Sequence, residues 1–284
     1  MHHIRSMTQV EAKRLVDWAE SEGWNPGTHD AETLWKADQD AFLAMVVDEK
    51  LAGGGAIFRH SSSFGFMGLF IMTPEFRGQG LGRQLWVERR DRLRERLGEK
   101  GVVGLDGVDA MLPFYARGGF EPAYRHCRFS LDVSGRSFEA NRKVRKIDHE
   151  IQRELLSFDQ GCFPGERSSY VSAWLQQPEA LLLGSFEGDL LNGYSVLRPC
   201  RSGWKVGPLY ANGADAARAL LQECCRLSSH GTVSIDVPEN NVEGWKLCES
   251  LGMEQVFQCT RMYLGNAPDL HHDRIFGITC LEAG

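Results

Sequence analysis

The sequence has no uninterrupted apolar run long enough to cross a bilayer, although 42% of its 284 residues are hydrophobic. Its first residues, Met1 to Arg5, lack the apolar stretch of a signal peptide. An excess of positive charge is also absent, because the formal net charge is −6. The densest basic stretch, Arg83 to Arg96, is interleaved with acidic residues and predicts a solvent-facing helix. We therefore expect a cytoplasmic protein that binds neither membranes nor nucleic acid.

Cysteine patterns suited to metal binding are missing as well. None of the eight cysteines forms a CxxC pair, and none lies near a histidine at zinc-finger spacing. This indicates reduced, mostly buried thiols and no metal site. Charged residues make up 25% of the chain, close to the average of soluble globular proteins, so disorder is not expected.

A polar stretch, Glu139 to Lys143, has linker composition and separates two halves with nearly the same order of elements. In the first half, periodicity and turn residues predict helices over Gln9–Glu22 (capped by Thr8), Gly78–Leu97 and Ala110–Arg117, and strands over Ala41–Val47, Leu51–Arg59, Phe64–Met72, Val102–Leu105 and Phe120–Val133. In the second half they predict helices over Asp148–Phe158, Ala214–Ser228 and Asn241–Leu251, and strands over Ala180–Phe186, Leu191–Arg198, Trp204–Tyr210, Val233–Val237, Met253–Leu264 and Ile275–Leu281. A repeat this long indicates two copies of one α/β domain, which we place at 1–135 and 136–284.

The most informative segment runs from Gly68 to Arg83. A buried strand leads into a turn at Thr73-Pro74, and Arg77 is followed by three glycines at alternate positions that open a long helix. Such glycines let backbone N–H groups converge on an anion, and the helix N-terminus adds partial positive charge. A phosphate or pyrophosphate is the expected guest. A Walker loop is excluded because no Gly-Lys-Ser/Thr follows, and the GxGxG spacing differs from the dinucleotide fingerprint.

Ile71 to Gly82 resembles the acyl-coenzyme A pyrophosphate loop of the GNAT N-acetyltransferase superfamily, with Arg77, Gly80 and Gly82 at its core positions. Phe114 to Phe120 is similar to a later motif of that family, in which a helical tyrosine precedes a Gly-Phe strand start. The resemblance implies an α/β fold with two GNAT-like domains, each a mixed, largely antiparallel central sheet flanked by helices. It also implies acetyl-CoA as co-substrate, bound by residues that follow in chain order: Phe70, Ile71, Met72, Arg77, Gly78, Gln79, Gly80, Leu81, Gly82, Arg83, Phe114 and Arg117.

The second half resembles a further GNAT-type domain of a tandem bacterial subfamily, through Gly207 to Ala211, Ile235 to Asn241 and Thr260 to Tyr263. It departs from the pattern where Ala211-Asn212-Gly213 leads straight into a helix without the glycine loop, and where Cys248 replaces the tyrosine. We expect this domain to be degenerate and to shape the acceptor pocket or an interface. A homodimer is a further expectation from the family.

The mechanism implied by the resemblance is direct attack of an amine on the acetyl thioester. Backbone N–H groups along Phe70, Ile71 and Met72 are expected to bind the acyl carbonyl, and Tyr115 is the candidate acid for the leaving thiolate. A core aromatic is the alternative for Tyr115.

The base is less well defined by the sequence. Asp106 is the best carboxylate by position, with a turn or capping role as its alternative, and His126, Glu121 or relayed water could also take the proton. Acceptor contacts are expected from the loop after the first helix, at Trp24, Asn25 and Asp30, although a purely structural turn fits those residues equally.

The leading hypothesis is therefore an acetyl-CoA-dependent N-acetyltransferase acting on a small-molecule amine. Two alternatives stay open: a non-catalytic acyl-CoA-binding sensor or interaction module, and a protein N-acetyltransferase. The sequence does not name the acceptor.

Overall fold

The structure is a computed structural model of the chain and describes residues 1–98, 100–147 and 152–284. The strands of the first half are β1 (His2–Ser6), β2 (Phe42–Val47), β3 (Lys50–Arg59), β4 (Phe64–Met72), β5 (Val102–Gly107) and β6 (Glu121–Asp132). Its helices are α1 (Gln9–Ser21), α2 (Asp30–Ala37), α3 (Leu81–Leu97) and α4 (Leu112–Ala116). The strands of the second half are β7 (Val144–Lys146), β8 (Leu181–Glu187), β9 (Leu190–Pro199), β10 (Trp204–Ala211), β11 (Thr232–Pro238), β12 (Glu254–Leu264) and β13 (Ile275–Gly277). Its helices are α5 (Gln152–Gln160), α6 (Ser168–Leu175), α7 (Ala214–Ser228) and α8 (Val242–Ser250).

Local sequence signals explain most of these elements. The predicted cap of α1 is confirmed, because the Thr8 hydroxyl accepts from the Glu11 amide while the Glu11 carboxylate accepts from the Thr8 amide. Several predicted boundaries are wrong, including the following three. Helix α3 begins only at Leu81, α4 is shorter than expected, and the last strand ends at Gly277 because the chain then leaves β10. The predicted start of a helix at Asp148 lies outside the described residues.

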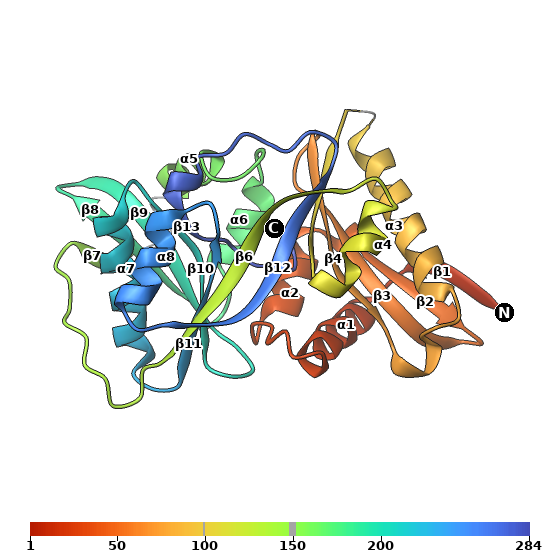
Figure 1. Cartoon of the computed structure of the whole chain (residues 1–284), viewed down its shortest axis with the longest axis horizontal. Helices are drawn as coiled ribbons and strands as arrows, with labels where there is room; N and C mark the ends of the chain where they lie inside the picture. Colours follow the sequence, from red (N-terminus) through yellow and green to blue (C-terminus); the bar gives the residue numbers. More distant parts are fainter. Residues whose placement is uncertain (99, 148–151) are drawn as a thin grey trace.

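The thirteen strands of the described residues form one continuous sheet in the order β1-β2-β3-β4-β5-β12-β6-β11-β10-β9-β8-β7, with β13 paired to β10. The sheet is mixed and largely antiparallel, as predicted; the described parallel pairs are β4 with β5 and β10 with β11. Each half gives its last long strand to the other, since β12 pairs with β5 and β6 pairs with β11. Strands β6 and β12 therefore run side by side across the middle of the molecule (Figure 1).

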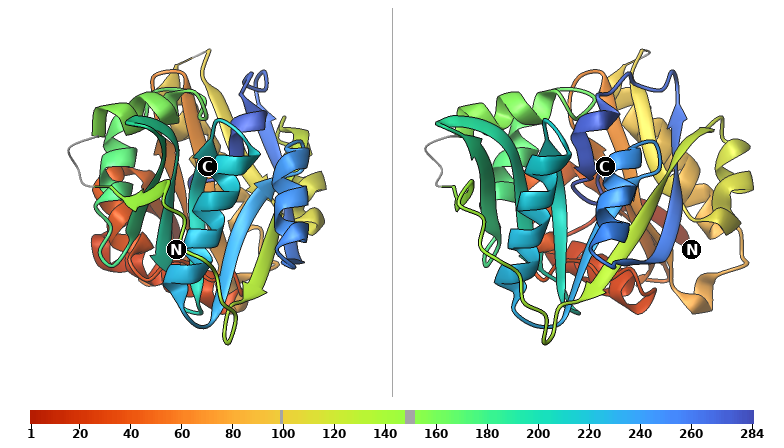
Figure 2. Two further views of the ribbon diagram at one scale, coloured as in Figure 1. Left: turned by 90° about the vertical axis from the view of Figure 1, so that its left-hand side faces the viewer. Right: turned by 60° about the vertical axis from the view of Figure 1, so that its left-hand side comes forward.

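Helices cover both faces of this sheet, as the two further views show (Figure 2). In β3, a Cβ on Gly54 would overlap Met7 and approach Leu15 of α1, whereas a Cβ on Gly55 would overlap Arg89 of α3. Neighbouring strand residues point to opposite faces, so α1 and α3 pack on opposite sides of the sheet. The small residues of β3 let both helices approach closely.

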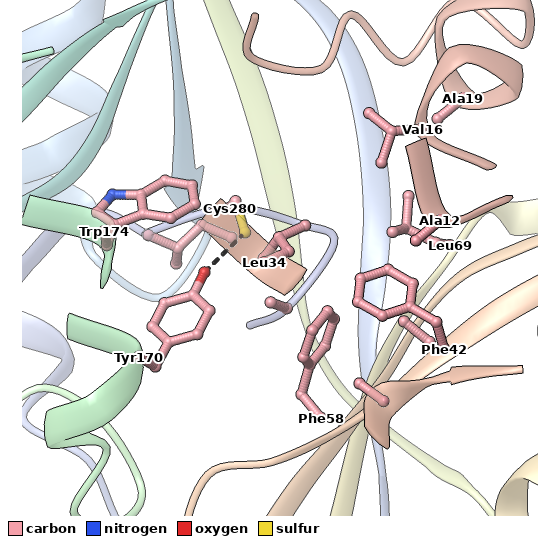
Figure 3. Close-up of a cluster of buried hydrophobic side chains, with 14 of the residues drawn as sticks. Ala12, Val16, Ala19, Leu34, Phe42, Phe58, Leu69, Tyr170, Trp174 and Cys280 are labelled. Carbon is pink, nitrogen blue, oxygen red and sulfur yellow. Dashed lines mark hydrogen bonds between the residues drawn. The ribbon is translucent and has the colours of Figure 1, made fainter. Parts of the chain in front are cut away.

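One buried core joins the two halves. Leu34 of α2 and Phe42 of β2 belong to the same apolar cluster as Tyr170 and Trp174 of α6. Figure 3 shows these side chains together with Cys280, whose sulfur lies 3.4 Å from the Tyr170 hydroxyl. The cluster buries side chains from both halves against each other, so neither half encloses this core by itself.

The segment after β12 contacts the sheet at two places, first between β10 and β11 and then beside β4. In the second half, β13 pairs with β10, and the Ile278 amide then donates to the Asp236 carbonyl of β11 at 3.0 Å. The chain continues to the first half, where a Cβ on Gly68 of β4 would overlap the Glu282 carbonyl oxygen. This one segment therefore fills the gap between β10 and β11 and reaches the gap beside β4.

No helix in the described ranges is both long and apolar enough to span a membrane.

Candidate active site

The glycine loop lies between β4 and α3, as predicted. Gly78 and Gly80 have φ angles of +75° and +79°, which side-chain-bearing residues rarely adopt. A Cβ at either position would meet no other atom within 4 Å, so the backbone conformation and not space requires glycine. Gly80 is the N-cap of α3 and offers no side chain to satisfy the first N–H groups of the helix. The loop therefore presents unpaired N–H donors at a positive helix end.

Arg77 connects this loop to the end of α1. Its Nε donates to the Met72 carbonyl at 2.8 Å, and its guanidinium forms an ion pair with Glu22. Both side chains are partly exposed, so the pair is open to exchange with a bound anion.

A cavity of about 900 Å³ opens beside the loop. Nine of the twelve residues expected to bind the cofactor line it, namely Phe70, Ile71, Met72, Arg77, Gly78, Gly80, Gly82, Arg83 and Phe114. The other three do not: the Gln79 side chain donates to the Glu75 carbonyl, Leu81 is buried in the core, and Arg117 is exposed.

The cavity exists because β4 and β5 separate. Their parallel pairing runs from Phe64 and Val102 to Met67 and Leu105 and stops there. Beyond it Leu69 has a φ of +52°, and no described strand pairs with the edge of β4 from Phe70 onward on the β5 side. Backbone groups along this edge are therefore available to a ligand, which fits the expected binding of an acyl carbonyl.

Tyr115 reaches the same cavity from α4. Gly107 leaves room for its ring, since a Cβ there would lie 3.0 Å from two ring atoms. Among the described residues its hydroxyl makes no hydrogen bond, although the side chain is 9% exposed. Burial raises the pKa of Tyr115, and the nearby cation of Arg89 opposes that shift in part. A protonated phenol with a free hydroxyl therefore faces the cavity.

Arg89 was not predicted as a site residue. It is 1% exposed and lies on α3, where its Nη2 donates to the carbonyls of Ala56 and Gly68 at 2.7 and 2.6 Å. Its guanidinium carbon is 5.2 Å from the centre of the Phe70 ring. No carboxylate of the described residues pairs with it, and burial lowers its pKa to about 10. The result is a buried positive charge beside the cavity.

Asp106 lines the cavity, but both of its carboxylate oxygens are occupied. They accept from Nε and Nη2 of Arg261 on β12 at 2.7 and 2.9 Å. His126 lies 3.7 Å away; burial lowers its pKa to about 4, despite the opposing charge of Asp106, and keeps its ring neutral at pH 7. His126 does not line the cavity, and Glu121 is exposed. Asp106 and Arg261 therefore form an ion pair that connects β5 to β12.

Of the three acceptor residues expected, the structure places two at the cavity. Trp24 lines it, and its carbonyl accepts from Arg128 and Lys205, both at 3.1 Å. Asn25 also lines it and exchanges two hydrogen bonds with Ser202.

Asp30 lies elsewhere. It is 1% exposed and accepts from the Gly27 amide at 2.7 Å and from Arg198 of β9 at 3.0 Å. Burial alone would raise the pKa of Asp30, but the charge of Arg198 outweighs it and holds the pKa below its usual value. Asp30 therefore connects the two halves.

The second half supplies a wall of the cavity, and the residues that form this wall were not identified from the sequence. Its members that line the cavity are Ser202, Thr232, Ser234, Val256, Phe257, Cys259, Leu281 and Glu282. Arg128 and Ser130 of β6 stand beside them, and Arg128 forms a buried, two-point ion pair with Asp236 of β11 at 2.7 and 2.9 Å. No local motif marks these residues, because the strand exchange and the segment after β13 bring them to the cavity from distant parts of the chain.

Within the described ranges, no group of three or more His, Cys, Asp or Glu side chains is arranged to hold a metal ion.

Comparison with protein-family models finds the acetyltransferase (GNAT) domain twice, at residues 18–130 and at residues 155–277. The chain belongs to the GNAT acetyltransferase family, as a tandem of two such domains. The first match contains the glycine loop, the separated strands and Tyr115.

Several proteins resemble this chain over nearly its whole length. The holothin acyltransferase of Pseudoalteromonas sp. (strain SANK 73390) is 26% identical over 94% of this chain and 90% of its own length. A proposed acetyltransferase from Pyrococcus horikoshii is 21% identical, with a TM-score of 0.85 over 100% of this chain and 96% of that one. A tandem GNAT protein from the clavulanic acid biosynthesis pathway is 12% identical, with a TM-score of 0.66 over 95% and 100% of the two chains. These structural likenesses show the fold.

The second GNAT domain differs from the first at the positions of the glycine loop, the strand gap and Tyr115. Helix α7 begins at Ala214, two residues after Asn212, so no glycine loop precedes it. The gap between β10 and β11, which corresponds to the gap beside β4, is filled by β13. Cys248 of α8, at the position of Tyr115, is 1% exposed in the core. The degenerate second domain contributes walls instead of a second cleft.

Proposed function

We propose that the chain transfers an acetyl group from acetyl-CoA to the primary amine of a small molecule, at the cavity between its two halves. The observation that carries this proposal is the convergence of three features on one cavity: the glycine loop, the unpaired edge of β4 and the free Tyr115 hydroxyl. Each feature serves a different requirement of acyl transfer from a thioester.

The residues present fit coenzyme A. The left-handed glycines and the uncapped start of α3 suit a pyrophosphate, and the mixed apolar lining by Phe70, Met72 and Phe114 suits the pantetheine arm. When bound, acetyl-CoA supplies an acyl thioester. The loop would hold its phosphates, the β4 edge would bind the acyl carbonyl, and Tyr115 would donate its proton to the departing sulfur.

The acceptor class is inferred from the cavity walls. The acceptor end is enclosed by Trp24 and Asn25 of the first half and by Phe257 of the second. A site built between two halves, with a total volume of about 900 Å³ for both substrates, favours a small molecule over a folded protein. The similarity to holothin acyltransferase over nearly the whole chain supports the same choice.

Asp106 fits a structural role better than a catalytic one. An acid–base residue must be free to exchange a proton with the substrate, whereas both oxygens of Asp106 are bound by Arg261. We therefore assign Asp106 to holding β12 in place beside β5.

Two measurements test the proposal. Titration calorimetry should show one acetyl-CoA bound per chain, because no glycine loop precedes α7 in the second domain and β13 fills the gap between β10 and β11. A thiol-release assay with acetyl-CoA should show turnover with at least one of lysine, spermidine, kanamycin, glucosamine and aniline. Binding without turnover of any of these amines would favour the alternative of an acyl-CoA sensor, and two binding sites per chain would contradict the assignment of the second domain.

A further inference from the structure

Three carboxylates line the cavity, and only one of them lacks a cationic partner among the described residues. Glu22 pairs with Arg77, and Asp106 pairs with Arg261. The Glu282 carboxylate makes no ion pair and no hydrogen bond with any residue that the structure describes, and its Oε2 atom is buried. A buried carboxylate without a partner is costly to fold, so its position calls for a functional reason.

The backbone holds Glu282 beside β4, where β4 and β5 separate. It is 4% exposed and lies in the segment that follows β13. Its carbonyl oxygen packs against Gly68, where any side chain would overlap it. Gly68 immediately precedes the bend at Leu69 and the unpaired edge of β4. Glu282 therefore lines the cavity next to the place where the acyl carbonyl is expected.

Charged and titratable groups surround Glu282 from several elements. Arg128 of β6, which is engaged by Asp236 of β11, and Lys205 of β10, which donates to the Trp24 carbonyl, both interact with it electrostatically without forming an ion pair. Glu282 also acts electrostatically on the Cys200 thiol, after β9, and on the Cys280 thiol of its own segment. Arg89 of α3 donates to the Gly68 carbonyl. Because these cations have other partners, the Glu282 carboxylate stays free for a ligand.

We propose that Glu282 is the catalytic base that binds the protonated acceptor amine and takes its proton before attack. This inference rests on the proposed function and narrows its substrate to alkylamines, which are cationic at pH 7. The bond from the amine nitrogen to the acyl carbon forms, and the bond from that carbon to sulfur breaks. One amine proton passes to Glu282 and then to solvent. Tyr115 gives its proton to the sulfur and recovers the second amine proton, which leaves a neutral amide and a free thiol.

The test is Glu282→Gln, which keeps the shape of the side chain and removes its ability to accept a proton. Turnover of spermidine, lysine, kanamycin or glucosamine should fall by about 10²–10⁴-fold at pH 7. This loss of turnover should shrink by about tenfold for each pH unit toward alkaline pH, because more of the amine is then already neutral in solution and needs no base. Turnover of aniline, which is already neutral, should change much less.

Binding provides a readout apart from activity. Calorimetry should give the same affinity for acetyl-CoA in both proteins, while spermidine should bind the Glu282→Gln–CoA complex about tenfold more weakly or worse, because a charge-assisted contact is lost. Glu282→Asp should keep the pH profile of the wild type at a reduced rate. Glu239→Gln is the matched control, because that exposed carboxylate pairs with Arg125 and does not line the cavity.

Two results would overturn the assignment. One is alkylamine turnover in Glu282→Gln within about threefold of the wild type. The other is a loss of equal size at every pH, which indicates a structural role. Both of these results would leave the proposed function intact. If instead the wild type binds acetyl-CoA and acetylates none of the amines, the proposed function fails, and the role of Glu282 fails with it.

Discussion

Replacing Tyr115 by phenylalanine removes one hydroxyl and leaves the ring in place. In the structure that hydroxyl has no hydrogen-bond partner among the described residues, while the ring packs against Trp86 and Phe114 and over Gly107. The substitution therefore keeps the packing and leaves no polar group unpaired. The stability of the protein should change by well under about 1 kcal/mol.

Catalysis should respond very differently. If Tyr115 protonates the departing sulfur, kcat should fall by about 10²–10⁴-fold, which corresponds to roughly 2.7–5.5 kcal/mol of lost transition-state stabilisation. KM for acetyl-CoA should move little, because the phenol is needed mainly as charge develops on sulfur. Burial raises the pKa of Tyr115 above its ordinary value, so the acid remains protonated through the neutral range and should not limit the rate there.

The measurement is thiol release at saturating acetyl-CoA with the best amine of the panel, alongside thermal unfolding of both proteins. Tyr124→Phe is the matched control, because the Tyr124 hydroxyl is hydrogen-bonded to that of Tyr263 and Tyr124 does not line the cavity. Turnover of Tyr115→Phe within a few-fold of the wild type would refute the reasoning, and Tyr115 would then be a packing residue. A large drop in thermal stability would contradict the structural half of the argument.

Three further outcomes are expected. Gly80→Val should weaken acetyl-CoA binding at least about tenfold in calorimetry, because valine is strained at a φ of +79°; unchanged affinity would contradict the assignment of the loop. Asp30→Ala should lower the free energy of unfolding by about 3–5 kcal/mol in urea titrations, since it leaves the buried cation of Arg198 without its carboxylate partner, and a change below about 1 kcal/mol would argue against that pair as a link between the halves. Burial lowers the pKa of His60 to about 3 and of His126 to about 4, so both are neutral when folded while the unfolded chain binds protons below about pH 6.5. Stability should therefore be fully present above that pH and decline from pH 6.5 to 4, and His126→Asn should reduce the slope; an unchanged slope would show that His126 titrates alike in both states.

The part of the site that could be predicted from the sequence is the part that is built locally. Pro74, Arg77 and the three glycines are close neighbours in the chain, and they define strand, turn and helix start by their own conformational preferences. Tyr115 is similarly placed by a short helix and the turn at Gly118-Gly119. Confirmed features such as the Thr8 cap have the same local origin.

The rest depends on distant partners. The alternation of apolar residues in β6 and β12 shows which side of a strand is buried and does not identify its neighbours, so the exchange was not predicted. Asp106 lies where a base would be useful, but Arg261, which occupies it, is 155 residues away. Strands β1 and β7 and helices α2 and α6 were missed. Strand β1 is an exposed edge strand, β7 has three residues, and α2 and α6 have eight residues each, too few for a distinct period.

The strand exchange also sets the order in which the protein can mature during synthesis. The glycine loop and Tyr115 are synthesised early. Strand β5, which pairs with β4 on one side, receives its second neighbour, β12, only when residues 254–264 have emerged from the ribosome. Many tandem proteins fold one unit at a time from the N-terminus. Here one edge of β5 stays unpaired until most of the second unit has been made, and a half-length product lacks both β12 and the second-half wall, so it cannot assemble the cavity.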